Sequence, residues 1–101
     1  MKVYLDDERA TPDGWVRAFW PDQVIELLKT GEVTHLSLDH DLGDDARGTG
    51  YDVLTWLEQA AFEGTLRIPE IAIHSANAAG RQRMAAAVRS IQRFVQAKKE
   101  P

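Results

Sequence analysis

Acidic residues and histidines occur at a few points of the sequence, each directly after a short apolar run. Asp6 and Asp7 follow the first run. Asp39 and His40 follow a second run, and His74 follows a third. Short apolar runs of this kind are typical of buried strands, and ligands of parallel α/β sheets bind beyond the carboxyl ends of the strands. We therefore expect these five residues to share one crevice along a rim of a sheet.

The three aspartates of this group predict a cation site. Neighbouring strands lie roughly 4.8 Å apart, so Asp6, Asp7 and Asp39 would converge if their strands are neighbours. Carboxylates this close repel one another unless a proton raises one pKa or a cation lies among them. A divalent cation that prefers oxygen ligands, Mg²⁺ or Mn²⁺, is the simplest solution. The alternative for any single aspartate is an ordinary turn or helix cap.

The two histidines at strand ends, His40 and His74, are candidates for proton transfer. Histidine titrates near neutral pH, so one ring could serve as base and the other as acid. Metal ligation or hydrogen bonding to loop backbone is the alternative for both. His35 lies inside a strand pattern, and we expect it to be a packed or surface residue.

Small polar residues and arginines near the same points could bind an anion. Ser75 and Asn77 follow the third apolar run, and Arg81 lies near the start of the last expected helix. Helix N-terminal amides and guanidinium groups both bind anions. Arg9 and Arg47 are further candidates for charge balance. The alternative for an arginine at a helix start is simple solvation.

Strands and helices are expected to alternate along the chain. We predict strands over 2–6, 15–19, 34–39 and 69–74, and helices over 21–30, from about 50 to 63, and from 77 onward. Thr49 with Asp52 resembles a capping box, and Gly64 can end the helix that it starts. Alternation of this kind predicts an α/β fold with three layers: a parallel sheet of about four strands with helices on both faces.

Composition limits the class of protein. With 101 residues, 44% of them hydrophobic and 28% charged, the chain is expected to form a single domain over 1–101 rather than a disordered chain. It has no cysteine, which excludes disulfides and thiolate metal sites and fits a cytoplasmic location. A net charge of -4 argues against nucleic-acid binding through overall charge, so arginines or a metal would have to neutralise an anionic ligand. We see no signal peptide and no membrane span, and expect no membrane partner.

Several motifs together resemble a known family. Asp6-Asp7, Asp39 at a strand end, 50–54 opening a helix and Ser75 resemble the receiver domain of response regulators. A narrower set resembles the cyclic-phosphate-processing receiver-like domains: 5–9, 12–15, 37–43, 49–52, 74–77 and Gly80-Arg81. Receiver domains bind Mg²⁺ at the acidic pair and accept phosphate on the strand-end aspartate. The narrower resemblance implies action on cyclic phosphate ends in RNA repair.

The chain departs from true receivers at two places. The segment between Asp7 and Trp15 is too short for the usual first helix. Receivers also end their last strand in a lysine that senses the phosphoryl group. A final strand over 93–98 would place Lys98 there, but Phe94 and Val95 continue the apolar stripe of the preceding helix. We therefore predict one long helix and no final receiver strand, which weakens a role in phosphotransfer signalling.

The leading functional hypothesis is a metal-assisted phosphoesterase acting on a cyclic phosphate or nucleotide phosphate end. Asp6, Asp7 and Asp39 would hold the metal, and His40 and His74 would divide the acid and base duties. The residues expected to contact the phosphate are Arg9, Ser75, Asn77 and Arg81. Covalent attack by Asp39 is a variant. The alternatives are a non-enzymatic module that binds a nucleotide or a partner, and a signalling domain with Asp39 as phosphoacceptor.

Overall fold

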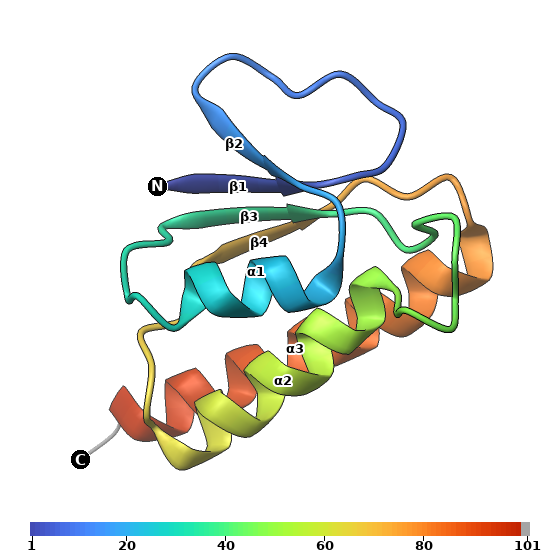
Figure 1. Ribbon diagram of the computed structural model, residues 1–101. Coiled ribbons are helices and arrows are strands. Elements are labelled where there is room, and N and C mark those ends of the chain that lie inside the picture. Colours follow the sequence, from blue (N-terminus) through green and yellow to red (C-terminus); the bar gives the residue numbers. More distant parts are fainter. Residues whose placement is uncertain (100–101) are drawn as a thin grey trace.

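The computed structural model describes residues 1–99, which form four strands and three helices (Figure 1). In chain order the elements are β1 (Lys2–Leu5), β2 (Trp15–Ala18), α1 (Pro21–Leu28), β3 (His35–Leu38), α2 (Gly50–Glu63), β4 (Glu70–Ile73) and α3 (Ala78–Lys99). All strand pairs are parallel, in the order β2-β1-β3-β4. The predicted α/β, receiver-like fold with a four-stranded parallel sheet is confirmed.

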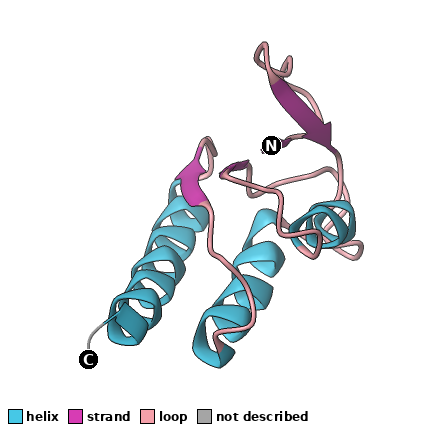
Figure 2. Cartoon of the chain, turned by 90° about the vertical axis from the view of Figure 1, so that its left-hand side faces the viewer, coloured by secondary structure: helices cyan, strands magenta, loops and turns pink. Residues whose placement is uncertain are grey.

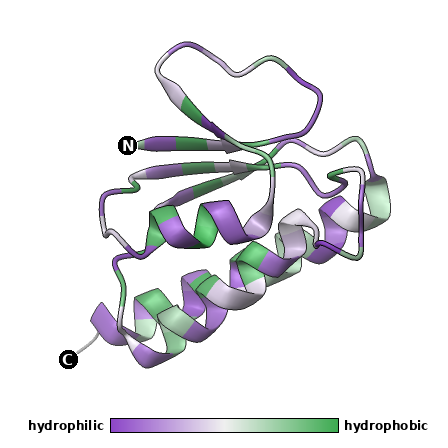
Figure 3. Cartoon of the chain, in the orientation of Figure 1, coloured by the Kyte–Doolittle hydropathy of each residue, from purple (hydrophilic) through white to green (hydrophobic). Residues whose placement is uncertain are grey.

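One face of the sheet carries the core. Val3 and Leu5 of β1 pair in register with Leu36 and Leu38 of β3, and all four are buried. They belong to one hydrophobic cluster with residues of the three helices, such as Leu57. Hydrophobic and hydrophilic residues accordingly alternate along β1 and the helices (Figure 3). The core therefore lies between the sheet and a single layer of helices.

All three helices cover the same face, so the prediction of three layers with helices on both faces is corrected. Figure 2 shows the helices together below the sheet and no helix on its other side. Right-handed crossovers explain this arrangement. The connections from β2 to β3 and from β3 to β4 cross the sheet in one direction, which places α1 and α2 on one side. The connection from β1 to β2 runs the opposite way, but residues 6–14 contain no helix.

The helix termini follow the predicted local rules. The Thr49 hydroxyl accepts a hydrogen bond from the Tyr51 amide at 3.2 Å, and the Asp52 carboxylate accepts one from the Thr49 amide at 2.8 Å, which completes the capping box. Gly64 ends α2 with a left-handed φ of 70°. The Asn77 side chain accepts a hydrogen bond from the Gly80 amide at 2.9 Å and so satisfies a donor in the first turn of α3.

The C-terminal segment is one helix, as predicted. α3 begins near the carboxyl ends of the strands and ends on the opposite side of the molecule (Figure 1). The Lys98 side chain lies there against Gly64, where an added Cβ would be 3.2 Å from Lys98 Cε. No fifth strand follows β4 within residues 1–99, and Lys98 is not placed as a sensor lysine. None of the described helices is long and apolar enough to cross a membrane.

Gly50 brings the start of α2 against the end of β3. The Gly50 amide donates to the His40 carbonyl at 3.1 Å, and a Cβ added to Gly50 would lie 1.9 Å from the Asp39 carbonyl oxygen. A backbone atom cannot move away as a flexible side chain can. This position therefore requires glycine because of close packing and not because of a positive φ.

We expect Gly50→Ala to lower the free energy of unfolding by about 3 kcal/mol or more, because the methyl group overlaps the Asp39 carbonyl. Gly31→Ala is the matched control: Gly31 has a φ of 76° but nothing within 4 Å of its added Cβ, so only a conformational cost of about 1 kcal/mol is expected. Urea denaturation of both variants measures the difference. Equal losses of unfolding free energy in the two variants would contradict the close packing of Gly50 against the Asp39 carbonyl.

Candidate functional site

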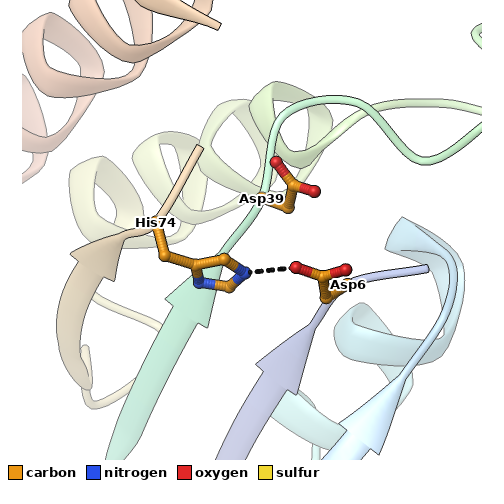
Figure 4. Close-up of side chains that lie close together, drawn as sticks. All are labelled: Asp6, Asp39 and His74. Carbon is orange, nitrogen blue, oxygen red and sulfur yellow. Dashed lines mark hydrogen bonds and ion pairs between the residues drawn. The ribbon is translucent and has the colours of Figure 1, made fainter. Parts of the chain in front are cut away.

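Three predicted site residues meet at the carboxyl ends of adjacent strands (Figure 4). Asp6, Asp39 and His74 directly follow β1, β3 and β4. The Asp39 amide donates to the Leu5 carbonyl and the His74 amide to the Leu38 carbonyl, both at 2.9 Å, which extends the sheet pairing to these residues. One ligand atom from each side chain lies within 4.8 Å of the other two. Sheet order and register therefore create this group.

Asp6 is a fully buried carboxylate with several hydrogen bonds. Its Oδ1 accepts from the amides of Glu8 and Arg9, each at 2.8 Å, and its Oδ2 lies 2.9 Å from His74 Nε2. Burial by itself would raise the pKa of Asp6, but the two amides and His74 outweigh it and lower the pKa below the usual value. Asp6 is therefore held as a carboxylate.

His74 is held on both ring nitrogens. Its Nδ1 lies 2.7 Å from Ser37 Oγ, and the ring stacks on Tyr4 with centroids 4.3 Å apart and planes within 2°. An ionised Asp6 can only accept hydrogen bonds, so Nε2 carries a proton in this arrangement. In a neutral ring Nδ1 then accepts the Ser37 hydroxyl. The imidazole is thereby oriented toward the two carboxylates.

Asp39 differs from Asp6 in its electrostatics. Its Oδ1 accepts the His40 amide at 2.8 Å, and the Ser75 hydroxyl also binds it. Burial raises the pKa of Asp39, and the neighbouring charge of Asp6 adds to the rise. These effects exceed the opposing hydrogen bonds. The fold thus favours the ionised form of Asp6 and disfavours the ionised form of Asp39.

Two carboxylate oxygens and one imidazole nitrogen could hold a metal ion. The relevant atoms belong to Asp6, Asp39 and His74. Burial raises the pKa of Asp39, and the charge of Asp6 adds to this rise; a cation would relieve the repulsion between the two carboxylates. Asp7, the third predicted metal ligand, is not a member of this close group. It lies near Gly43, where an added Cβ would be 3.3 Å from the Asp7 carboxylate.

A cleft of about 310 Å³ opens beside the group. It is lined by Asp6, Asp7, Glu8, Arg9, Asp39, Asp41, Gly43, Ala76 and Asn77. Arg9 is the cationic side chain of this lining: its guanidinium donates to the His74 carbonyl, and its Nε lies 3.9 Å from Asp6 Oδ2. Carboxylates dominate the lining, so an anionic ligand would need a cation in addition to Arg9 to bind here.

His40 lies apart from this cleft. Its ring packs on Gly80, where an added Cβ would be 2.7 Å from His40 Cγ, and its Nδ1 lies 2.8 Å from Asp41. Asp41 also accepts from Asn77 at 3.2 Å. The hydrogen bond with His40 lowers the pKa of Asp41. The His40–Asp41–Asn77 group therefore joins the loop after β3 to the start of α3, and neither His40 nor His74 is among the residues that line the cleft.

The predicted phosphate contacts have different positions. Asn77 and Arg9 line the cleft, whereas Ser75 is buried beneath it and accepts the Asn77 amide at 3.1 Å. Arg81 donates to the Ser75 carbonyl at 3.2 Å and supports this turn from outside the lining. Arg47 lies 3.8 Å from Asp22 and stacks over a tryptophan of the α1 region, so it does not balance charge in the cleft.

His35 is remote from the site, whereas Tyr4 and Ser37 belong to it without having been predicted from the sequence. His35 pairs with Glu70 at 3.0 Å, far along the strands from the cleft, as expected of a surface residue. Tyr4 and Ser37, which contact His74, were not predicted. Their signal was present in the sequence: each lies two residues before a site aspartate, and alternate residues of a strand share one face.

A parallel sheet of order 2-1-3-4 with acidic strand ends defines a receiver-like domain. The chain belongs to the cyclic-phosphate processing receiver domain family, whose model matches residues 1–90. This match confirms the resemblance predicted from the motifs. No curated protein and no solved structure shows a significant match to the chain.

The two aspartates should have opposite effects on stability. Because the pKa of Asp39 is raised in the fold, its ionised form destabilises the protein at neutral pH. Asp39→Asn should therefore raise Tm by a few degrees at pH 7 in chelator, and the gain should vanish as the pH falls below about 4, where Asp39 is protonated in both states.

Because the pKa of Asp6 is lowered, its ionised form stabilises the fold above the unfolded-state pKa, and this stability is lost as the pH falls through the folded-state value. Asp6→Asn should lower Tm at neutral pH, with a smaller loss in acid. Thermal unfolding of both variants between about pH 3 and pH 7 measures the difference. Shifts of the same sign at neutral pH would refute this electrostatic description.

Proposed function

We propose that this protein is a metal-assisted phosphoesterase that opens cyclic phosphate ends of RNA or of nucleotides. The observation that carries the proposal is the convergence of Asp6, Asp39 and His74 within 4.8 Å beside an open cleft. The family supports the same conclusion, because its description names cyclic-phosphate processing. Ring opening adds water: a bond forms from the water oxygen to phosphorus, one ring P–O bond breaks, and the released ribose oxygen takes a proton.

Asp6, Asp39 and His74 would hold the metal, with Asp7 at the cleft edge. A bound divalent ion would withdraw charge from the phosphoryl oxygens or lower the pKa of a water molecule. Of the two ions predicted from the sequence, Mn²⁺ fits this set better than Mg²⁺, because Mg²⁺ strongly prefers oxygen ligands. The Ser37 hydroxyl, 2.7 Å from Nδ1, would then accept the Nδ1 proton of His74 and so orient the ring.

The residues of the cleft lining would act on the phosphate itself. Arg9 is positioned to neutralise a phosphoryl oxygen, since its guanidinium lies at the edge of the Asp6–His74 pair. Asp39 would take a proton from the attacking water, because its carboxylate lines the cleft beside Asp6. Asn77 shapes the wall, since its side chain caps α3 and binds Asp41.

This proposal changes the roles predicted for the histidines. The sequence suggested that His40 and His74 divide acid and base duties. We now assign His74 to the metal and His40 to positioning of the loop before α3, because His40 is enclosed by Gly80 and Asp41. Ser75 and Arg81 likewise support the turn after β4.

Hydrolysis of a 2′,3′-cyclic nucleoside monophosphate in the presence of Mn²⁺ tests the activity. Asp39→Asn should lower kcat/KM by roughly a hundredfold or more, because it removes both a ligand charge and the proton acceptor. Asp45→Asn is the matched control, since Asp45 is exposed in the loop before α2 and should leave kcat/KM unchanged. Full activity of Asp39→Asn, or no turnover of any cyclic phosphate by the unaltered protein, would refute the proposal.

Metal binding can be measured apart from turnover. Mn²⁺ at about a hundred times its Kd should stabilise the unaltered protein by roughly 2.7 kcal/mol, visible as a rise in Tm that chelator reverses. His74→Gln should abolish most of the rise. The rise should also diminish as the pH is lowered, because binding displaces protons from the ligands. A Tm that does not respond to Mn²⁺ or Mg²⁺ would exclude the metal site.

The other two functions predicted from the sequence give different results in these experiments. A non-enzymatic binding module would be stabilised by a cyclic nucleotide without turnover. A phosphoacceptor domain would be labelled on Asp39 by a small phosphodonor in the presence of metal. Lys98 packs against Gly64 at the C-terminal end of α2, and this position favours the phosphoesterase over the phosphoacceptor.

A further inference from the structure

The face of the sheet opposite the helices carries aromatic and basic side chains. Tyr4 of β1 and Trp15 of β2 have ring centroids 6.2 Å apart, and both are only partly buried. Lys2 lies over the Trp15 ring at 5.8 Å. Tyr4 and Trp15 are absent from the hydrophobic core cluster and from the residues packed against it. They are therefore not part of the core beneath the sheet.

This aromatic surface is continuous with the candidate site. Tyr4 stacks on His74, which in turn contacts Asp6. Asp6 directly follows β1, and its amide continues the sheet pairing by donating to the Ala18 carbonyl at 3.2 Å, so its side chain lies on the same face as that of Tyr4 two residues earlier. The three rings His74, Tyr4 and Trp15 thus form a row that begins beside Asp6 and continues over β1 and β2. A ligand whose end lies in the cleft would extend naturally over this row.

The same face carries basic side chains that are able to contact phosphate groups. At its strand positions Lys2 and Arg17 are basic, and Glu70 is acidic but already paired with His35. Arg9 adds a cation where the face meets the cleft. The Arg17 guanidinium lies 4.8 Å from the Phe19 ring and donates a long hydrogen bond of 3.4 Å to Thr11, and its buried Nε has no partner within the described residues. The basic side chains of the face therefore lie over β1 and β2, whereas carboxylates dominate the adjoining cleft.

We propose that this open face binds the single-stranded RNA that leads into the cyclic phosphate, with bases stacked beside Trp15 and Tyr4 and phosphates near Lys2 and Arg17. The inference rests on the proposed function, and it makes the substrate an RNA end rather than a free nucleotide. Partly exposed aromatic rings and nearby cations are the two features that bind single strands without sequence preference. A row of this length accommodates about two or three bases, as on other sheet surfaces that bind RNA.

The test compares two substrates: a 2′,3′-cyclic mononucleotide and an oligoribonucleotide of about six residues that ends in the same group, long enough to cover the face. We expect a higher kcat/KM for the oligonucleotide, and Trp15→Ala should lower that preference roughly tenfold because one stacked base is lost. Phe62→Ala is the control: Phe62 is an aromatic residue with 59% exposure on α2, and its loss should not change the preference.

Binding is measured separately with a fluorescent, uncleavable oligoribonucleotide with a 3′-hydroxyl end, so the result does not depend on turnover. Lys2→Ala should reduce the slope of log K against log salt by about 0.7, the value for one lost phosphate contact on a single strand. Because Lys2→Ala leaves Trp15 in place, this second variant tests the RNA surface even if Trp15→Ala does not fold.

The outcomes separate this inference from the proposed function. Trp15-dependent RNA binding without turnover would support the RNA surface and refute the esterase. Equal kcat/KM for both substrates, unaffected by Trp15→Ala, would refute the RNA surface and leave the esterase intact. Failure to bind RNA, together with a dimer in sedimentation that Trp15→Ala dissociates, would also overturn the inference, because the face would then bind a second copy of the chain.

Discussion

Burial of the Asp6 carboxylate is the constraint on which the site depends. An ionised carboxylate without partners would be very unfavourable at a fully buried position. Here the amides of Glu8 and Arg9 and the ring of His74 supply the hydrogen bonds that lower its pKa. These partners come from distant parts of the chain, since His74 lies 68 residues after Asp6. Folding of the loop after β1 and docking of β4 are therefore coupled through one side chain.

The same arrangement makes the ionised form of Asp39 unfavourable. Its charge faces Asp6, and its pKa is raised by burial and by that neighbour. Perturbed pKa values of this kind cluster at functional sites. The free energy that the ionised Asp39 costs the fold must be offset by other interactions. The large core under the sheet and the close fit of Gly50 against Asp39 supply that support. Stability and chemistry are therefore provided by opposite faces of the sheet.

The one-sided helix layer distinguishes this chain from a complete receiver fold. Residues 6–14 stand in place of a crossover helix, and within residues 1–99 no strand follows β4. Both differences leave sheet surface uncovered. The open face carries Tyr4 and Trp15 and continues to His74 at the carboxyl ends of the strands. A helix over this face, as predicted from the alternation of elements, would have buried it.

Local features of the sequence determined the positions of most strands and helices and the gathering of Asp6, Asp39 and His74 at one rim of the sheet. Strand positions follow from apolar runs, the start of α2 from the Thr49–Asp52 capping box, and the continuity of α3 from its apolar stripe, because each depends on residues close in the chain. The placement of Asp6, Asp39 and His74 at one rim followed from their positions after strands. The tertiary structure alone decided which face the helices cover, that His40 packs on Gly80, and that Asp7 lies outside the close group. These outcomes depend on crossover direction, strand order and side-chain packing between distant segments, which no local pattern encodes.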